Sequence, residues 1–138
     1  MIILDTNVLS ECLKPSPDVS VVEWMAAQPR ASLFTTTVVE AEILYGVCLL
    51  PDGARKNALN KEIKAIFAED LSGRVIPFDR DCAAAYADIA AQRKAMGQPI
   101  SQFDAMIAAA TRSRDAMLAT RNMRDFVHCG IKLIDPWV

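Results

Sequence analysis

Short apolar runs alternate with longer amphipathic segments along the chain. The first run, 1–4, has no polar alternation and ends at an acid, which is typical of a buried parallel strand at the centre of a sheet. Further strands are predicted at 33–36, 74–78 and 117–120, with an edge strand at 132–134. Strands that alternate with helices form parallel sheets with right-handed crossovers. We therefore predict a three-layer α/β/α domain with a mainly parallel sheet of four to five strands.

Helices are predicted between these strands from capping residues and apolar stripes. The expected helix starts are Asp18, Thr37 (with Glu40 at capping-box spacing), Ala54, Asp79 and Ser101. The expected ends are just before Pro29, near 51–53, at Ala68, at Met96 and at about Asp115. No repeat, low-complexity segment or domain boundary interrupts the pattern, so residues 1–138 are expected to form a single domain.

The composition excludes several classes of protein. A chain of 138 residues with 52% hydrophobic residues can bury a core without covalent staples. The cysteines (Cys12, Cys48, Cys82 and Cys129) are scattered, which argues against a zinc site and a secreted disulfide framework. The longest apolar stretch, 43–50, is far below the roughly 20 residues that span a bilayer. The chain begins without a basic signal-peptide region. We expect a cytoplasmic protein that does not insert into membranes.

Polar residues follow each predicted strand, and most are acidic. They are Asp5 and Asn7, then Thr36, Thr37, Glu40 and Glu42, then Asp79 and Asp81, and finally Thr120, Asn122 and Asp125, with Asp104 in the first turn of its helix. The carboxyl ends of parallel strands share one edge of the sheet, where open α/β domains bind ligands. Carboxylates about 5 Å apart repel by about 3 kcal/mol per pair at an effective dielectric near 20. A hard cation such as Mg²⁺ or Mn²⁺ would offset that repulsion.

Each acid also has a structural interpretation. Asp104 has capping-box spacing from Ser101, and Glu40 is most simply the capping-box partner of Thr37. That interpretation of Glu40 leaves Glu42 as the better metal ligand. Asp79 and Asp81 are interpreted as acids at the start of a helix. Asp5 has the weakest structural explanation, because a charge at the end of a buried strand is costly unless it is paired or bound to metal.

Other chemistries are less well supported by the sequence. The single histidine, His128, has no evident nucleophile or orienting partner, which argues against a catalytic triad and a histidine-based ribonuclease. The chain contains neither a P-loop nor a dinucleotide-binding glycine motif. Metal-assisted phosphodiester hydrolysis is therefore the favoured chemistry.

Four segments together resemble the motifs of a PIN-domain ribonuclease of the VapC type. They are the opening segment 2–10, segment 37–46, segment 103–109 and segment 118–126, and the closing segment 134–137 resembles the FitB-like branch. The resemblance implies the toxin of a type II toxin–antitoxin pair, a Mg²⁺-dependent endoribonuclease that forms homodimers and is inhibited by an antitoxin. Asp5, Glu42 and Asp104 match the three acidic metal positions of the family. Many members have an aspartate where this chain has Asn122, so the number of metals and the role of Asp125 stay open.

We therefore expect Asp5, Glu42 and Asp104 to hold Mg²⁺ and to activate a water that cleaves RNA, leaving a 5′-phosphate and a 3′-hydroxyl. Asn7, Thr120, Asn122 and Asp125 are expected to support the site. The segment 111–132 carries a net charge of +3 against −2 for the chain, and Arg112, Arg121 and Arg124 within it are candidates for RNA phosphate contacts. The RNA target and the identity of the antitoxin do not follow from the sequence.

Two other functions are compatible with parts of the sequence. One is a phosphatase with an aspartate nucleophile, although its motif requires an acid where Asn7 stands. The other is a catalytically degenerate PIN fold that acts only as a binding module, a possibility raised by Asn122. Assays of RNA cleavage and of phosphate-monoester hydrolysis distinguish the three functions.

Overall fold

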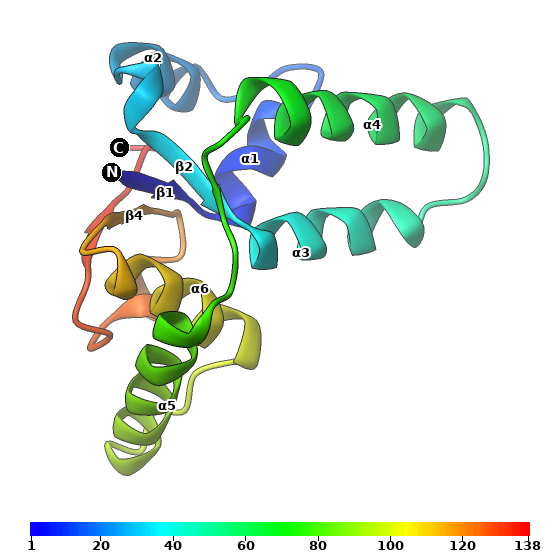
Figure 1. Ribbon diagram of the computed structural model, residues 1–138. Coiled ribbons are helices and arrows are strands. Elements are labelled where there is room, and N and C mark those ends of the chain that lie inside the picture. Colours follow the sequence, from blue (N-terminus) through cyan, green and yellow to red (C-terminus); the bar gives the residue numbers. More distant parts are fainter.

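A central five-stranded sheet organises the computed structural model, which describes all residues, 1–138 (Figure 1). Its strands are β1 (Ile2–Leu4), β2 (Leu33–Thr36), β3 (Val75–Ile76), β4 (Met117–Ala119) and β5 (Lys132–Ile134). Their order is β3-β2-β1-β4-β5, and every neighbouring pair is parallel. This arrangement confirms the predicted parallel sheet, the central position of the first strand and the edge position of the last.

The central strand is buried because it has neighbours on both edges and helices on both faces. Ile3 is 0% exposed and Leu4 is 1% exposed. Ile2 pairs with Leu33 on one side and with Met117 on the other. An uninterrupted apolar run suits a strand in this position, since neither of its faces meets water.

Helices cover both faces of the sheet. On one side lie α1 (Thr6–Cys12) and α2 (Val19–Ala27), and on the other lie α5 (Arg80–Ala95) and α6 (Gln102–Ser113) (Figure 1). Half of the residues of α6 are buried, including the run 107–111. The predicted three-layer α/β/α architecture is therefore confirmed. No helix has both the length and the apolar character needed to cross a membrane.

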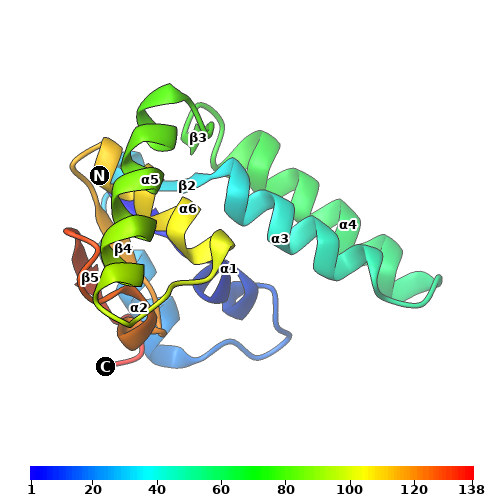
Figure 2. The same ribbon diagram turned by 90° about the horizontal axis from the view of Figure 1, so that it is seen from below.

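An antiparallel pair of helices, α3 (Thr37–Cys48) and α4 (Ala54–Ala65), projects away from the sheet (Figure 2). Ile63 anchors α4 and is only 1% exposed. The last turn of the predicted helix 54–68 is not α-helical, because the chain widens into a π-helical turn at Ile66–Asp70. In that turn the Leu71 amide donates to the Ile66 carbonyl at 2.8 Å, which displaces the regular α-helical bond.

Helix starts follow the predicted caps, with one exception. The side chains of Asp18, Asp79 and Ser101 accept hydrogen bonds from backbone amides of the helices they precede. The cap of α3 is Thr36 rather than Thr37, since Thr36 Oγ1 accepts from the Val39 amide at 3.1 Å. Thr37 instead accepts from the Phe78 amide at 3.3 Å. The predicted capping box of Thr37 with Glu40 is therefore wrong.

The helix α1 was not predicted from the sequence, because its first residues resemble a turn. The structure instead makes Asp5 the N-cap of this helix. Short 3₁₀ turns at Arg30–Ser32 and Met123–Phe126 were also not predicted. The third strand is shorter than the predicted 74–78, and it ends just before Pro77, which has no amide hydrogen to donate to a sheet.

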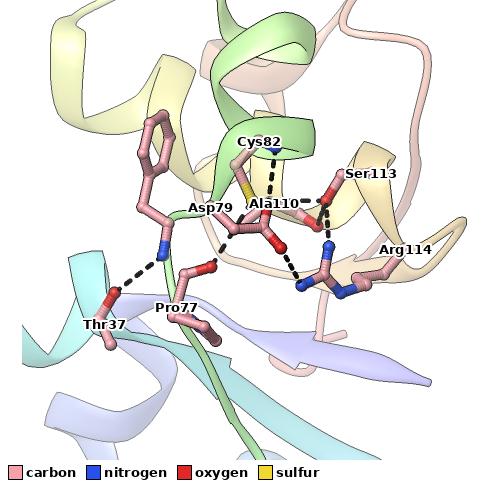
Figure 3. A network of polar contacts seen from close by, with 8 residues as sticks. Thr37, Pro77, Asp79, Cys82, Ala110, Ser113 and Arg114 are labelled. Carbon is pink, nitrogen blue, oxygen red and sulfur yellow. Dashed lines mark hydrogen bonds and ion pairs between the residues drawn. The ribbon is translucent and has the colours of Figure 1, made fainter.

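The helices α5 and α6 pack antiparallel, and a polar network joins the start of α5 to the end of α6 (Figure 3). Arg114 Nη2 lies 2.8 Å from Asp79 Oδ2 in an ion pair. Cys82 Sγ lies 3.5 Å from Ser113 Oγ and 3.7 Å from the Pro77 carbonyl oxygen. The network fixes one end of the helix pair, which carries Asp104 at its other end.

Candidate functional site

The strand order places a crevice between the carboxyl ends of β1 and β4. These strands are neighbours, but β1 leads to β2 on one side and β4 leads to β5 on the other. Such a switch point is where open α/β sheets bind ligands. Asp5 follows β1 directly and Thr120 follows β4. The Thr120 hydroxyl donates to Asp5 Oδ2 at 2.6 Å, so the two strand ends meet at this carboxylate.

A polar pocket opens at this point, and we call it the acidic pocket. It encloses about 380 Å³ and has no hydrophobic lining residue. The residues that line it are Asp5, Thr6, Asn7, Ser10, Glu42, Asp104 and Asn122. The fold therefore brings together the three acids predicted as metal ligands, one from the end of β1, one from α3 and one from α6.

Asp5 is held rigidly at the bottom of the pocket and is only 3% exposed. Besides the Thr120 hydroxyl, the Thr6 amide donates to Oδ1 at 2.8 Å and the Asn7 side-chain amide donates to Oδ2 at 3.1 Å. On sequence alone Asp5 had the weakest structural explanation of the acids, and this part of the interpretation is wrong because Asp5 also caps α1. An asparagine would cap the helix equally well, so the cap does not by itself explain the negative charge.

Glu42 and Asp104 are less constrained than Asp5. The Thr6 hydroxyl donates to Glu42 Oε1 at 2.8 Å, while Glu42 Oε2 accepts no hydrogen bond. Ser101 Oγ caps α6 by accepting from the Asp104 backbone amide at 3.2 Å. The cap therefore uses the main chain of Asp104 and leaves its side chain to line the pocket.

The pKa of each of the three acids is raised above its ordinary value. Burial is the largest cause in every case. Asp104 raises the pKa of Asp5 further, and both of these acids raise the pKa of Glu42. The pKa of Asp104 is also raised by Asp125, while Arg93 acts in the opposite direction. None of the three carboxylates forms an ion pair with a lysine or arginine.

These carboxylates have the chemistry of a site for a hard divalent cation. Mg²⁺ and Mn²⁺ prefer carboxylate oxygens, and a bound cation would favour the ionised form of all three acids, whose pKa is raised by burial and by neighbouring carboxylates. As they stand, no three histidine, cysteine or acidic side chains converge into a ready metal-binding group.

The predicted supporting residues surround Asp5. Thr120 Oγ1 accepts from the Asn122 backbone amide at 3.1 Å and from the Asn7 side-chain amide at 3.3 Å. Asn7 and Asn122 both line the pocket. Asp125 is exposed in the turn Met123–Phe126 and does not line it, although its charge raises the pKa of Asp104.

The three predicted RNA-binding arginines lie in different places. Arg121 and Arg124 are exposed just after β4, and the Arg121 amide donates to Asn7 Oδ1 at 3.2 Å. The Arg121 guanidinium lies 5.1 Å from the centre of the Trp137 ring. Arg112 instead lines a separate cavity with Met1, at the end of the sheet where the strands begin. The structure therefore does not bring Arg112 together with the acids.

Some residues of the site were missed by sequence reasoning. Ser10 lines the pocket one helical turn after Thr6, and it would have been found if α1 had been predicted. Arg93 is buried near Asp104, and nothing in the sequence distinguishes it from its exposed neighbour Lys94.

An α/β/α domain with acids gathered at the switch point of a parallel sheet matches the PIN-like class of fold. The PIN domain family matches residues 2–130, and the chain belongs to this family. It is 38% identical to VapC ribonuclease Y4jK of Sinorhizobium fredii, covering 99% of this chain and 98% of that protein. It is 35% identical to toxin FitB of Neisseria gonorrhoeae, covering 99% of each. The solved structure of FitAB bound to an IR36 DNA fragment superimposes with a TM-score of 0.93 at 35% identity, covering 100% of this chain and 96% of that one.

Proposed function

We propose that this protein is a Mg²⁺-dependent endoribonuclease, the toxin of a type II toxin–antitoxin pair. The observation that carries the proposal is the gathering of Asp5, Glu42 and Asp104 in one acidic pocket without an ion-pair partner. The relatives support it, since one of similar length is named a VapC ribonuclease and another a toxin.

In the proposed site Asp5, Glu42 and Asp104 hold Mg²⁺, for which Mn²⁺ can substitute. The bound ion would supply charge compensation and a more acidic water for attack on an RNA phosphate. Thr120, Thr6 and Asn7 orient Asp5 and favour its ionised form, because each donates a hydrogen bond to its carboxylate. Thr6 also fixes Glu42, which couples the start of α1 to α3. Arg121 and Arg124 remain candidates for phosphate contacts beside the pocket.

A groove adjoining the acidic pocket supports an antitoxin partner. It lies between α1, α3 and α4, encloses about 300 Å³ and shares Thr6, Ser10 and Glu42 with the pocket. Its apolar lining is Leu13, Ile43, Val47, Leu50, Leu59 and Ile63. A partner segment with apolar side chains in this groove could place a cationic side chain among the acids, where it would substitute for the metal charge. A complex that inhibits while leaving the acidic pocket open would contradict this part of the proposal.

A homodimer is part of the same proposal and is tested by measuring the mass of the purified protein in solution.

The test of the proposed activity is cleavage of an unstructured RNA with Mg²⁺ and with a chelator. We expect Mg²⁺-dependent cleavage that leaves 5′-phosphate and 3′-hydroxyl ends, because water rather than the ribose 2′-hydroxyl is the proposed nucleophile. Asp5→Asn, Glu42→Gln and Asp104→Asn should each remove most activity and retain the fold. Asp88→Asn, which changes an exposed acid on α5, is the matched control.

Each alternative function gives a different result in this assay. Cyclic 2′,3′-phosphate ends would reject the proposed chemistry. Hydrolysis of a phosphate monoester without RNA cleavage would indicate a phosphatase. The phosphatase alternative gains nothing from the structure, since Asn7 uses its amide to donate to Asp5. RNA binding with no cleavage under any divalent ion would indicate a degenerate binding module.

A further inference from the structure

Arg93, in the last turn of α5, is the only lysine or arginine that the fold buries, with 5% of its surface exposed. No carboxylate lies within ion-pair distance of it. An unpaired charge in this position is costly unless hydrogen bonds replace its water. The hydrogen bonds of the guanidinium must therefore replace its water, and their partners show which parts of the fold it holds.

One side of the guanidinium holds the connection between α5 and α6. Arg93 Nε donates to the Gln98 carbonyl at 2.7 Å, and the Gln98 amide donates to the Arg93 carbonyl at 2.9 Å. These two bonds close the loop that leads to Ser101 and Asp104. The position of the first turn of α6 therefore depends on Arg93.

The other side holds the segment that follows β4. Arg93 Nη1 donates to the Asp125 carbonyl at 3.0 Å and to the Val127 carbonyl at 2.9 Å, with a longer contact of 3.6 Å to Cys129 Sγ. This segment begins at Asn122, which lines the acidic pocket. A single side chain thus joins two irregular segments that each bring one residue to the pocket.

We propose that Arg93 is a positioning residue of the acidic pocket, which fixes Asp104 relative to Asn122 by holding the 97–101 loop against the 125–129 segment. Neither segment belongs to the sheet, so no strand pairing fixes their separation. The planar guanidinium suits this role, because its donors point to both sides in one rigid plane. The Mg²⁺ readout of the test rests on the proposed function, whereas the hydrogen-exchange readout does not.

The test compares Arg93→Met with Arg114→Met. Arg114 joins the same two helices at their other end, through its ion pair with Asp79 (Figure 3). Both variants remove a guanidinium that ties one end of the α5–α6 pair, but only Arg93 contacts segments that lead to the pocket. Arg93→Lys keeps the buried charge and removes the two-sided set of donors. Backbone hydrogen exchange in segments 97–104 and 122–129 and Mg²⁺ affinity by calorimetry are measured for each protein.

For Arg93→Met we expect faster exchange in both segments and Mg²⁺ binding weakened by about 10-fold or more, as for other groups that orient metal ligands. Arg93→Lys should bind Mg²⁺ almost as weakly, since one ammonium cannot reach both segments. Arg114→Met should lower the unfolding temperature and leave both readouts as in the wild type.

Three outcomes would overturn the proposal: unchanged exchange in either segment of Arg93→Met, wild-type Mg²⁺ affinity in Arg93→Met or Arg93→Lys, or an equal loss of affinity in Arg114→Met. If Arg93→Met does not fold, Arg93→Lys decides alone. If the wild type binds no Mg²⁺, the proposed function is wrong, and the exchange comparison by itself decides the role of Arg93.

Discussion

Asp5 shows how one side chain serves both the fold and the site. Its Oδ1 caps α1 and its Oδ2 accepts from Thr120, so the carboxylate joins a strand end, a helix start and the end of a second strand. The hydrogen bonds partly offset the cost of burying the charge, but the pKa of Asp5 is still raised. The protein therefore retains a poorly compensated carboxylate where an uncharged cap would be cheaper.

Asp104→Asn separates a metal ligand from an ordinary acid in the first turn of a helix. In chelator we expect the variant to be at least as stable as the wild type, because the substitution removes repulsion within the acidic pocket. The stabilisation by added Mg²⁺, which for a site saturated 100-fold above Kd is about 2.7 kcal/mol, should be smaller than in the wild type. Thermal melts with chelator and with Mg²⁺ measure both effects.

The matched control is Glu40→Gln, which changes a first-turn acid of α3 that lies outside the pocket. This variant should lose between a few tenths and about 1 kcal/mol of folding stability, and its stabilisation by Mg²⁺ should be the same as in the wild type. A lower stability of Asp104→Asn in chelator, together with a wild-type shift on adding Mg²⁺, would reject Asp104 as a metal-site residue.

At the scale of elements, the start of α3 decides where Glu42 stands. Thr36 is fully buried and ends β2, and its hydroxyl also begins the helix. Since the helix starts directly at the strand end, Glu42 lies in its second turn and reaches the hydroxyl of Thr6. The same junction thus sets the strand, the helix and the position of one acid.

Thr36→Val should destabilise the protein by about 1–3 kcal/mol, because it keeps the side-chain shape and leaves the buried Val39 amide without its acceptor. Thr37→Val is the control, and its effect should be smaller, since the bond it removes is longer and only partly buried. Urea unfolding midpoints of both variants measure the difference. Equal losses would mean that Thr36 is not the cap that matters.

The groove between α1, α3 and α4 can be tested as the docking surface of the antitoxin. Gly46 lines it, is exposed, and has no atom within 4 Å of the position a Cβ would take. Gly46→Leu should therefore fill part of the groove and weaken binding of the co-expressed antitoxin. The unfolding temperature should stay the same or rise, because glycine inside a helix costs about 1 kcal/mol relative to alanine. Wild-type affinity for the antitoxin would place its docking surface elsewhere.

At the scale of the whole molecule, the topology concentrates charge that the chain keeps apart in sequence. The strand order brings the ends of β1 and β4 together, and α3 and α6 each add one acid at the same edge. The folded protein binds protons at these acids more tightly than the unfolded chain does, because the pKa of each is raised. Folding stability is therefore linked to pH through this site.

We expect the contribution of the pocket to stability to fall as pH rises from the ordinary carboxyl range through the raised pKa values. The sign follows because the folded state holds more protons than the unfolded state in that window. Saturating Mg²⁺ should remove this loss, since the cation favours the ionised acids.

Urea unfolding across pH, with chelator and with Mg²⁺, measures this effect in the wild type and in a variant that combines Asp5→Asn, Glu42→Gln and Asp104→Asn. The difference between the two proteins gives the pH dependence that comes from the pocket acids, because Asp79 and Glu11 are unchanged in both. The pKa of these two acids is lowered by Arg114 and by Lys14, so their stabilisation is lost as pH falls. Parallel pH profiles for the two proteins in chelator would contradict the prediction.

Local signals in the sequence determined the strands, most helix starts and the three acids. Apolar period, caps such as Ser101, and an acid at the end of a buried run depend on a few neighbouring residues, so they can be interpreted without the fold. The limit of such signals appears at α1, where Asp5, Thr6 and Asn7 resemble a turn although buried Val8 and Leu9 hold a helix in place.

Only the tertiary structure decided which distant residues share the pocket. It placed Arg112 at the opposite end of the sheet, left Asp125 outside the pocket, and buried Arg93 between two segments that lead to it. The physical reason is that these placements depend on strand order and helix packing, which join residues far apart in the chain. The sequence by itself determined the kinds of chemical groups available, and packing determined which of them meet.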